Sequence, residues 1–352
     1  MKIAITSDIH ISPEHPERLV HFESFIRDLH QKKIMQVIIA GDLFDKDRLN
    51  ASLRDISRII SSFPDITIYV IPGNHDPSVH SKYFTSMDNL NVFSDPEVIE
   101  LGGIQFFFSP YRESSMGEAI EQYGEALHRG KWVLVSHGDV VGAARDATGN
   151  EGKSYFPLAA SDIAKYAPAC VFLGHIHEQR IIRDMIYYPG SLYPVSVDER
   201  GPRKYIIYDT GTYTCSIEQH TTDVVYFREH VTVIPFEHMN EHLVHSLKAV
   251  RKDWEKQGIG KENMRSVKAS IDLRGYTDDK ERISAIIRKW QERIGLHDLE
   301  VNDHMNIAHM SELEGITSDF IKEVYSTTIK GSQDYLPDAE SVIEGGLEIL
   351  YS

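Results

Sequence analysis

Five short motifs in this chain carry Asp, Asn or His directly after an apolar stretch, and such side chains are ligands of divalent cations. In chain order the motifs are Asp8-Ile9-His10, Gly41-Asp42, Gly73-Asn74-His75-Asp76, Ser136-His137-Gly138-Asp139 and Gly174-His175-Ile176-His177. The mixed carboxylate, amide and imidazole set suits Mn, Fe or Zn better than Ca, and it contains no thiolate. Two such ions about 3.5–4 Å apart can lower the pKa of a bound water molecule and hold phosphate oxygens for in-line attack. The residue types therefore predict a two-metal hydrolytic site.

Seven of these side chains are the candidate metal ligands, and one further imidazole is a candidate acid. The ligands are Asp8, His10, Asp42, Asn74, His137, His175 and His177. A nearby imidazolium can stabilise the negative charge of the transition state or protonate the leaving oxygen, and His75, next to Asn74, is placed for that role. Any one motif can occur by chance. Five in order, each after an apolar run, favour a shared site over unrelated polar strand ends.

The apolar run before each motif has the length of a buried strand. These runs are Ile3-Ala4-Ile5, Val37-Ile38-Ile39-Ala40, residues 66–71, Trp132-Val133-Leu134-Val135 and Cys170-Val171-Phe172-Leu173. Apolar residues at helical spacing predict helices over 16–33 and 51–63. The alternation of strand and helix predicts an α/β unit with a largely parallel sheet. Because ligands of such sheets lie beyond the carboxyl ends of the strands, the motifs occupy the expected position.

The rest of the first domain is predicted from shorter patterns. Strands are expected around 98–101 and 104–110, followed by a helix over 116–128. After His177, the segments 180–188, 204–209 and 213–219 are predicted to be antiparallel strands, with the last two joined at Thr210-Gly211. We expect all three segments to complete the second sheet of a sandwich.

A second, smaller module follows a boundary near residues 221–230. Its predicted elements are a strand at 231–236, a helix at 240–257, a strand at 267–273, a helix at 278–294 and a strand at 299–307. Their apolar stripes are most simply core contacts. Ser311-Glu312-Leu313-Glu314 is a capping-box pattern that predicts the start of a further helix. That helix either packs on its own protein or docks on a partner. The predicted domains are thus 1–222, 223–308 and a helical acidic tail, 309–352.

Composition indicates a folded protein of 352 residues, with 41% hydrophobic and 26% charged residues. No stretch approaches the roughly 20 apolar residues that span a bilayer, and the first residues lack a signal-peptide layout. With two cysteines and no disulfide scaffold, we expect a cytoplasmic protein that does not engage membranes.

The net charge of −16 argues against strong independent binding to nucleic acid, which is a polyanion. The distribution is uneven, however. Residues 248–293 carry thirteen Lys and Arg against eight Asp and Glu, whereas residues 311–352 carry two basic and nine acidic residues. The basic run is either an ordinary solvated face or a surface that faces DNA.

The order of these motifs closely resembles the calcineurin-like metallophosphoesterase superfamily. Gly41-Asp42-Leu43-Phe44-Asp45 and Tyr188-Pro189-Gly190-Ser191 resemble its DNA double-strand-break repair exonuclease branch, which includes bacterial SbcD-type nuclease subunits. The motifs cover residues 1 to about 195, and the second module matches the capping domain of that branch in order and size only. The resemblance implies a four-layer α-β-β-α sandwich with a smaller α/β capping domain and a helical C-terminal tail.

The resemblance also implies how the ligands are shared. Asp8, His10, Asp42 and His177 would hold one ion, and Asp42, Asn74, His137 and His175 would hold the other, with Asp42 bridging. His75 would be the catalytic histidine. Some relatives have a second histidine three residues after the bridging Asp, where this chain has Asp45. We hypothesise that Asp45 hydrogen-bonds His75 and keeps it protonated. The expected cofactors are two divalent ions, Mn²⁺ in preference to Fe or Zn.

The function expected from these features is a metal-dependent DNA nuclease, an exonuclease with endonuclease activity left open. The resemblance implies a subunit of an SbcCD-type DNA repair complex, with DNA (single-stranded or duplex ends) and an ATPase of the structural-maintenance (SMC) type as partners, and with a homodimer left open. The helix from Ser311 to about Lys330 would dock the ATPase, and residues 248–293 would face DNA. The alternatives are a small-molecule phosphodiesterase or phosphatase, and a non-catalytic scaffold. A scaffold would be expected to have lost ligands or His75, and none is missing.

Overall fold

A computed structural model describes residues 1–46, 49–84, 87–141, 154–234, 239–307 and 314–326, together with positions 342, 343, 345, 346 and 349. The chain divides into two compact units. The first comprises Met1–Glu199 and Arg203–Thr222, and the second comprises Arg200–Pro202 and Asp223–Ser352. Each unit is described by itself.

The first sheet of the first unit has the strand order β12-β11-β1-β2-β3-β4. Its strands are β1 (Lys2–Thr6), β2 (Gln36–Ala40), β3 (Thr67–Ile71), β4 (Leu90–Val92), β11 (Lys204–Asp209) and β12 (Thr214–Gln219). Strands β1 to β4 run parallel, whereas β11 pairs antiparallel with both β1 and β12. The carboxyl ends of β1, β2 and β3 therefore open at one edge of this sheet.

The second sheet has the order β5-β6-β7-β8-β10-β9. Its strands are β5 (Glu97–Leu101), β6 (Ile104–Ser109), β7 (Trp132–His137), β8 (Cys170–Gly174), β9 (Arg180–Ile182) and β10 (Ile186–Tyr188). Strands β6, β7, β8 and β10 are parallel, and the outer strands β5 and β9 are antiparallel to their neighbours. The central strands β7 and β8 are buried along their whole length, which explains their continuous apolar sequence.

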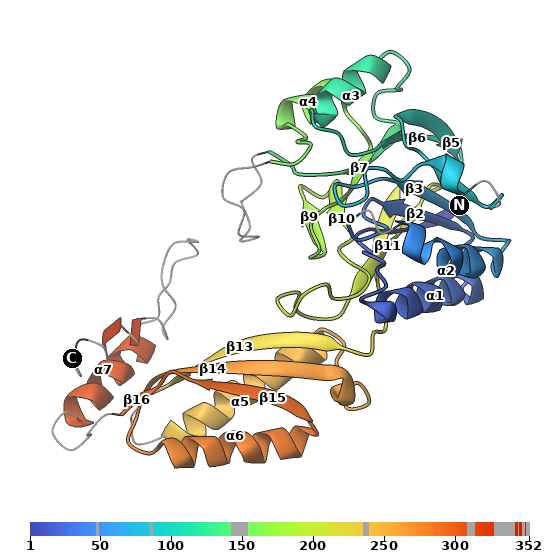
Figure 1. Ribbon diagram of the computed structural model, residues 1–352. Coiled ribbons are helices and arrows are strands. Elements are labelled where there is room, and N and C mark those ends of the chain that lie inside the picture. Colours follow the sequence, from blue (N-terminus) through green and yellow to red (C-terminus); the bar gives the residue numbers. More distant parts are fainter. Residues whose placement is uncertain are drawn as a thin grey trace. The chain divides into compact units, whose positions relative to one another are not determined.

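Three hydrophobic cores separate four layers (Figure 1). The helices are α1 (Pro16–Gln31), α2 (Leu49–Ser61), α3 (Met116–Tyr123) and α4 (Ala160–Tyr166), with a 3-10 turn at Ser81–Tyr83. In β1, Ala4 packs toward α1 and α2, while Ile3 and Ile5 enter the core between the two sheets. A third core joins the second sheet to α3 and α4 through residues such as Leu134 and Ile120. The predicted α-β-β-α sandwich is thus present.

One prediction about this sandwich was wrong. The segments after His177 do not all complete the second sheet, because β11 and β12 join the first sheet beside β1. Only β9 and β10 extend the second sheet, and β10 runs parallel to β8. The predicted helix over 116–128 also ends early, at Tyr123. Apolar alternation identifies a strand but carries no information about which of two stacked sheets receives it.

The second unit is a parallel sheet in the order β13-β14-β15, with β16 also paired to β14. Its elements are β13 (Val225–Val233), α5 (Met239–Lys256), a 3-10 turn (Met264–Ser266), β14 (Val267–Thr277), α6 (Lys280–Ile294), β15 (Asp298–Asp303) and β16 (Asn306–Ile307). Apolar residues of β13 and β14 alternate with polar ones and form one core with α5 and α6. Asp279 caps α6 by accepting a hydrogen bond from the Arg282 N–H, and Gly295 ends it in a left-handed conformation.

Helix α7 (Glu314–Ser326) follows in the second unit. Ile321 is buried with Ile234, Tyr276 and Ile343 of the same unit, whereas Ile316 is 58% exposed. The predicted capping box at Ser311 and most of the acidic tail lie outside the described residues. Within the described ranges, no helix is both long and apolar enough to cross a membrane.

Candidate metal centre

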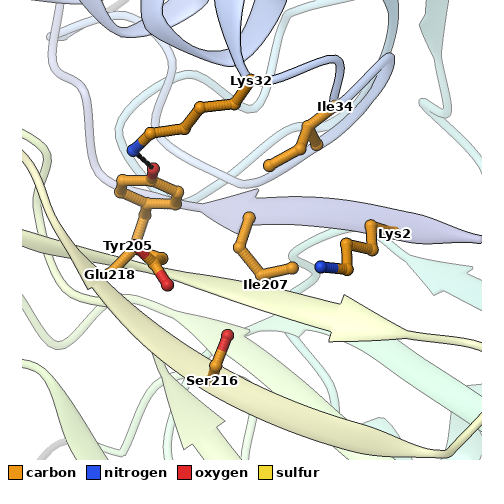
Figure 2. A pocket seen from close by; sticks show the side chains of 7 residues that line it. All are labelled: Lys2, Lys32, Ile34, Tyr205, Ile207, Ser216 and Glu218. Atoms are coloured by element: carbon orange, nitrogen blue, oxygen red, sulfur yellow. Dashed lines mark hydrogen bonds between the residues drawn. The ribbon is translucent and has the colours of Figure 1, made fainter.

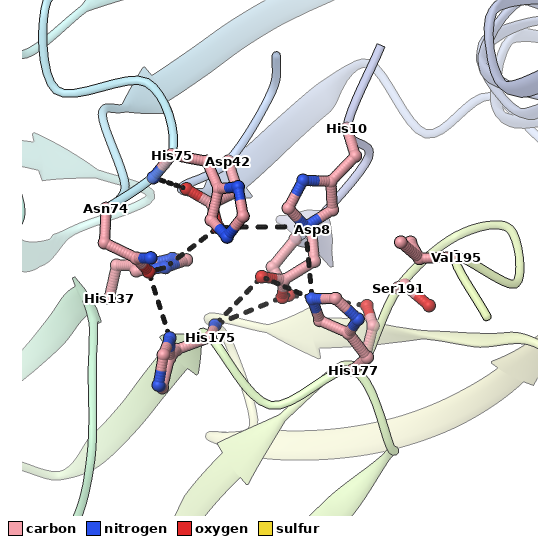
Figure 3. Close-up of polar contacts among 12 residues, drawn as sticks. Asp8, His10, Asp42, Asn74, His75, His137, His175, His177, Ser191 and Val195 are labelled. Carbon is pink, nitrogen blue, oxygen red and sulfur yellow. Dashed lines mark hydrogen bonds and ion pairs between the residues drawn. The ribbon is translucent and has the colours of Figure 1, made fainter. Parts of the chain in front are cut away.

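The seven predicted ligands come together at the carboxyl ends of strands from both sheets (Figure 3). Asp8 and His10 follow β1, Asp42 follows β2 and Asn74 follows β3. His137 is the last residue of β7, and His175 and His177 follow β8. Asp and His residues form three groups, and within each group the potential ligand atoms lie within 4.8 Å of one another. The groups are Asp8, His10 and His177; Asp8, Asp42 and His137; and His10, Asp45 and His75.

Four of these residues have backbone conformations that non-glycine residues rarely adopt. The φ angles of Asp8, His10, Asp42 and His175 are 51°, 51°, 52° and 97°. Such conformations cost on the order of 1–3 kcal/mol each and cluster at functional sites. Asp8, Asp42 and His175 adopt this conformation within two residues of the end of a strand, and His10 adopts it two residues after Asp8.

Two glycines allow the loops to approach. A Cβ atom on Gly41 would lie 2.1 Å from His137 Nδ1, and one on Gly73 would lie 2.1 Å from Asp42 Oδ1. Gly41 also has a φ angle of 92°, which L-residues with side chains rarely adopt. Both glycines are therefore required by packing, and Gly41 is required by its backbone conformation as well.

Asp42 lies at the middle of the cluster and is 1% exposed. Its Oδ1 accepts a hydrogen bond from the His75 N–H at 2.9 Å. Among the described residues, its buried Oδ2 has no hydrogen bond of acceptable geometry, although it lies 3.3 Å from His137 Nε2 and 3.7 Å from His10 Nε2. A buried acceptor without a partner costs about 1–3 kcal/mol. An oxygen left open between imidazoles of two groups fits a carboxylate that bridges two cations.

The charges of this metal-free cluster are strongly coupled. Burial disfavours the Asp42 carboxylate, but the His137 imidazolium outweighs burial and holds the pKa of Asp42 well below its usual range. Burial likewise lowers the pKa of His137, and Asp42 outweighs it, so that this pKa is raised to about 9. In the metal-free cluster, Asp42 and His137 thus favour each other's charged forms.

Ring nitrogens converge at one side of Asp42. His10 Nε2 and His177 Nε2 lie 3.1 Å apart, and His177 Nε2 lies 3.8 Å from Asp8 Oδ1. Neutral imidazoles offer one lone pair each, so two facing nitrogens beside a carboxylate are the arrangement expected of ligands to one ion. The Asp8 carboxylate is further fixed because both of its oxygens accept the His175 N–H, at 3.0 and 3.2 Å.

A second set of candidate metal ligands lies on the other side of Asp42. Asn74 Oδ1 lies 2.8 Å from His137 Nε2 and 3.0 Å from His175 Nδ1. The opposite nitrogen of His137, Nδ1, lies 2.9 Å from the carbonyl oxygen of Ala40. An N–H donated to that carbonyl leaves the Nε2 lone pair for a metal. His175 Nε2 lies 3.7 Å from Asp139 Oδ1.

His75 lies beside the ligands with its side chain 36% exposed. Its Nδ1 is 3.4 Å from Asp45 Oδ1, the partner predicted from the sequence. The same Asp45 oxygen is 4.0 Å from His10 Nδ1, and the other oxygen is 3.9 Å from the Arg18 guanidinium. Asp45 therefore contacts a ligand histidine as well as the candidate acid.

Two neighbouring carboxylates, Asp76 and Asp139, hold loops by accepting backbone hydrogen bonds. Asp76 accepts hydrogen bonds from the N–H groups of Gly73 and Phe44, at 2.7 and 3.0 Å, and so joins the Asn74 loop to the Asp42 loop. Asp139 accepts the Tyr155 N–H at 2.7 Å.

Sequence reasoning missed one polar group at the centre, Glu199. Its Oε1 lies 2.8 Å from His177 Nδ1, and its Oε2 lies 2.9 Å from the Arg203 guanidinium. No local signal marks it, because it lies 22 residues after His177 in an irregular stretch.

A surface cavity of about 230 Å³ lies away from the ligands (Figure 2). It is lined by Lys2, Lys32, Ile34, Tyr205, Ile207, Ser216 and Glu218. None of these is a candidate ligand, and Lys32 is already engaged with the Tyr205 hydroxyl at 2.9 Å. The cavity is therefore not part of the centre.

Comparison with protein families decides the class of this site. The family model described as calcineurin-like phosphoesterase matches residues 1–179, just over half of the chain. The chain belongs to the calcineurin-like phosphoesterase family. Members of this family use divalent metals, and the Asp and His groups of this phosphoesterase form a candidate site for them.

Two curated proteins and a solved structure are similar to this phosphoesterase. A protein of Invertebrate iridescent virus 3 named as a phosphoesterase, 078R, is 25% identical over 213 residues, which are 54% of this chain and 57% of that protein. The DNA double-strand break repair protein Mre11 of Aeropyrum pernix is 29% identical over 203 residues, which are 51% of this chain and 48% of that protein. The chain spans about half the length of these curated relatives. A dimetal phosphatase from Danio rerio is similar at 9% identity and a TM-score of 0.44, covering 62% of this chain and 95% of that structure.

Proposed function

We propose that this phosphoesterase is a two-metal phosphodiesterase that hydrolyses DNA. The observation that carries the two-metal part is the open Oδ2 of Asp42, buried between imidazoles that belong to two different groups of donors. Asp8, His10 and His177 would hold one ion with Asp42. Asn74, His137 and His175 would hold the other, again with Asp42. We favour Mn²⁺ for both positions, because nitrogen and oxygen ligands are mixed and thiolates are absent.

Two divalent cations held in this way supply an activated water molecule and bind the phosphate oxygens. The chain's own residues then orient the substrate and move protons. His75 lies next to the ligand cluster and is exposed enough to reach a bound phosphate, so it would protonate the leaving oxygen. Asp45 Oδ1 lies 3.4 Å from His75 Nδ1 and would hold the ring in position for this step.

Two observations favour DNA as the substrate. The first is similarity to an Mre11 protein, whose name refers to DNA double-strand break repair. The second is the basic composition of residues 248–293. A small-molecule phosphodiester would use the same centre. We therefore propose exonuclease activity on DNA ends, with endonuclease activity to be tested alongside.

One assay separates these substrates. Purified full-length chain with Mn²⁺ would be given single-stranded DNA, duplex ends and bis(p-nitrophenyl) phosphate side by side. We expect a much higher kcat/KM on DNA than on the aryl diester, and loss of both activities in His75→Ala. Turnover of the aryl diester without cleavage of any DNA would exclude the nuclease and favour the small-molecule enzyme.

Part of the basic run forms a stripe on α5. Lys248, Lys252 and Lys256 are exposed at intervals of one helical turn, and we propose that this face contacts DNA. Arg251 differs, because its guanidinium donates to the Ile259 carbonyl at 2.8 Å and pairs with Glu255. Changing the three lysines to Gln should weaken DNA binding and reduce its salt dependence. The control neutralises Lys33, Lys131 and Lys165, which are exposed in the first unit. Equal affinity in both triple variants would refute this face.

We further propose an ATPase of the structural-maintenance type as partner, docked by the segment from Ser311 to about Lys330. Ile316 on α7 is exposed, whereas Ile321 is buried in the core of its own unit. Co-expression with such an ATPase and an Ile316→Asp variant tests this, because the change leaves the buried contact of Ile321 in place. Undiminished co-purification of the variant would argue against α7 as the docking helix.

A further inference from the structure

The carboxylate of Glu199 is held rigidly between a candidate ligand and its own loop. Its Oε1 lies 2.8 Å from His177 Nδ1. Its Oε2 accepts hydrogen bonds from the Ser191 hydroxyl at 2.6 Å, the Val195 N–H at 3.1 Å and the Arg203 guanidinium at 2.9 Å. Ser191 and Val195 lie beside His177 in Figure 3. With donors on both oxygens and a side chain only 10% exposed, Glu199 has little freedom to reorient.

Arg203 closes this network from the other side. Its guanidinium also donates to the Ser191 hydroxyl at 3.0 Å and to the backbone carbonyl of His177 at 3.3 Å. The arginine side chain is 4% exposed, so the pair with Glu199 is shielded from solvent. Glu199 thus contacts the ring of His177, and Arg203 contacts its backbone. Together they fix both the position and the ring orientation of this candidate ligand.

We propose that Glu199 is a positioning residue for His177. The proposal rests on the proposed metal centre. A carboxylate that accepts the Nδ1–H of a ligand histidine fixes the tautomer, directs Nε2 at the metal and makes it more basic. Loss of such a partner typically lowers metal affinity about 10–100-fold.

The test measures Mn²⁺ binding to the full-length chain by titration calorimetry. In Glu199→Gln we expect two ions, one bound about 10–100-fold more weakly than in wild type and the other unchanged. The matched control is Glu178→Gln, a change of the same kind next to His177 in sequence, where the side chain is 73% exposed. Binding by Glu199→Gln that equals that of the control would overturn the positioning role.

The outcomes also separate this proposal from the proposed function. Wild-type chain that binds no Mn²⁺ would overturn the metal centre and this proposal together. If the wild type binds two ions but cleaves no DNA, the nuclease assignment fails. The expected loss of affinity in Glu199→Gln would still establish the positioning role.

Discussion

Each of the two units contains a buried aspartate on a parallel sheet, and the two aspartates have opposite surroundings. In the first unit, Asp42 follows the end of β2 in a left-handed turn, and its Oδ2 has no hydrogen bond of acceptable geometry among the described residues. In the second unit, Asp272 lies in the middle of β14 and is 2% exposed. Its Oδ1 accepts from the Asn302 amide at 2.8 Å and its Oδ2 from the Arg228 guanidinium at 2.9 Å.

The difference follows from position in the strand. Asn302 lies directly opposite Asp272 on one neighbouring strand, and Arg228 lies two residues from the opposite position on the other, so cross-strand neighbours supply its partners. Asp42 lies beyond the ladder, where no strand neighbour is available and loops from several strands meet. Burial of a carboxylate therefore does not identify a ligand. What distinguishes Asp42 is an oxygen left open toward imidazoles whose own outer nitrogens are already engaged.

The largest expected effect comes from a comparison of Asp42→Asn with Asp272→Asn. The first change removes the charge that we propose bridges two cations, and we expect kcat/KM to fall by at least about 10³-fold, roughly 4 kcal/mol of transition-state stabilisation. The second should leave turnover unchanged. Metal content by elemental analysis and phosphodiester turnover check both variants. Asp42→Asn protein that keeps two ions and its rate would contradict the assignment.

His75→Ala separates binding of the metals from proton transfer. Loss of a general acid should lower kcat by about 10²–10⁴-fold while leaving the metal content at the wild-type level. His15→Ala is the control, because His15 is an exposed histidine that contacts only Glu17 by hydrogen bonding through its ring. Equal rates in wild type and His75→Ala would favour the non-catalytic scaffold.

Metal loading should depend on pH through His137. Its pKa of about 9 in the metal-free protein means that a cation must displace a proton at neutral pH. The apparent affinity of that position should rise by about tenfold per pH unit below pH 9 if one proton is released. Calorimetric titration with Mn²⁺ in buffers of different ionisation enthalpy measures this proton. Affinity that is constant between pH 6.5 and 8.5 would show that no proton leaves.

The same proton affects the stability of the metal-free chain. Because the folded pKa of His137 is raised above the ordinary value of 6.5, its contribution to stability is fully present below pH 6.5 and is lost as pH rises through about 9. The His137→Gln variant should lack this part of the pH dependence. Thermal unfolding in EDTA across this range compares the two proteins.

A smaller effect is expected from Asp45→Asn. The change removes the carboxylate charge that lies 3.4 Å from His75 Nδ1, so His75 loses the partner that positions its ring. We expect kcat to fall by less than in His75→Ala, with the metal content at the wild-type level, as measured by phosphodiester turnover and elemental analysis. An unchanged kcat would show that Asp45 does not position His75, and would leave its contacts with His10 and Arg18 as its role.

The smallest predicted effect belongs to the second aspartate. Asp272→Asn keeps the shape but loses the charge-assisted bond to Arg228, and we expect the second unit to be destabilised by about 1–3 kcal/mol. Urea unfolding followed by tryptophan fluorescence reports mainly on this unit, because two of the three tryptophans, Trp254 and Trp290, lie in its core and Trp132 lies in the first unit. A loss of metal affinity in Asp272→Asn would contradict the distinction between Asp272 and Asp42.

The strands and the polar residues that follow them were predictable because both signals are local. A buried parallel strand is a short apolar run, and the turn after it shows as Gly, Asp, Asn or His, as in Gly41-Asp42. The assignment of β11 and β12 to the second sheet was wrong, because either sheet buries the same alternating pattern. The contact of Asp45 with His10 was also missed, since it depends on how two loops cross.

The amino-acid sequence by itself determined which side chains stand at the strand ends, since apolar runs and turn residues act within a few positions of each other. Only the tertiary structure decided that Asp42 keeps an open oxygen while Asp272 does not, and that Glu199 and Arg203 enclose His177. Those features depend on where distant backbone segments meet and on whether a buried polar atom finds a donor there. No local pattern of hydrophobicity encodes that outcome.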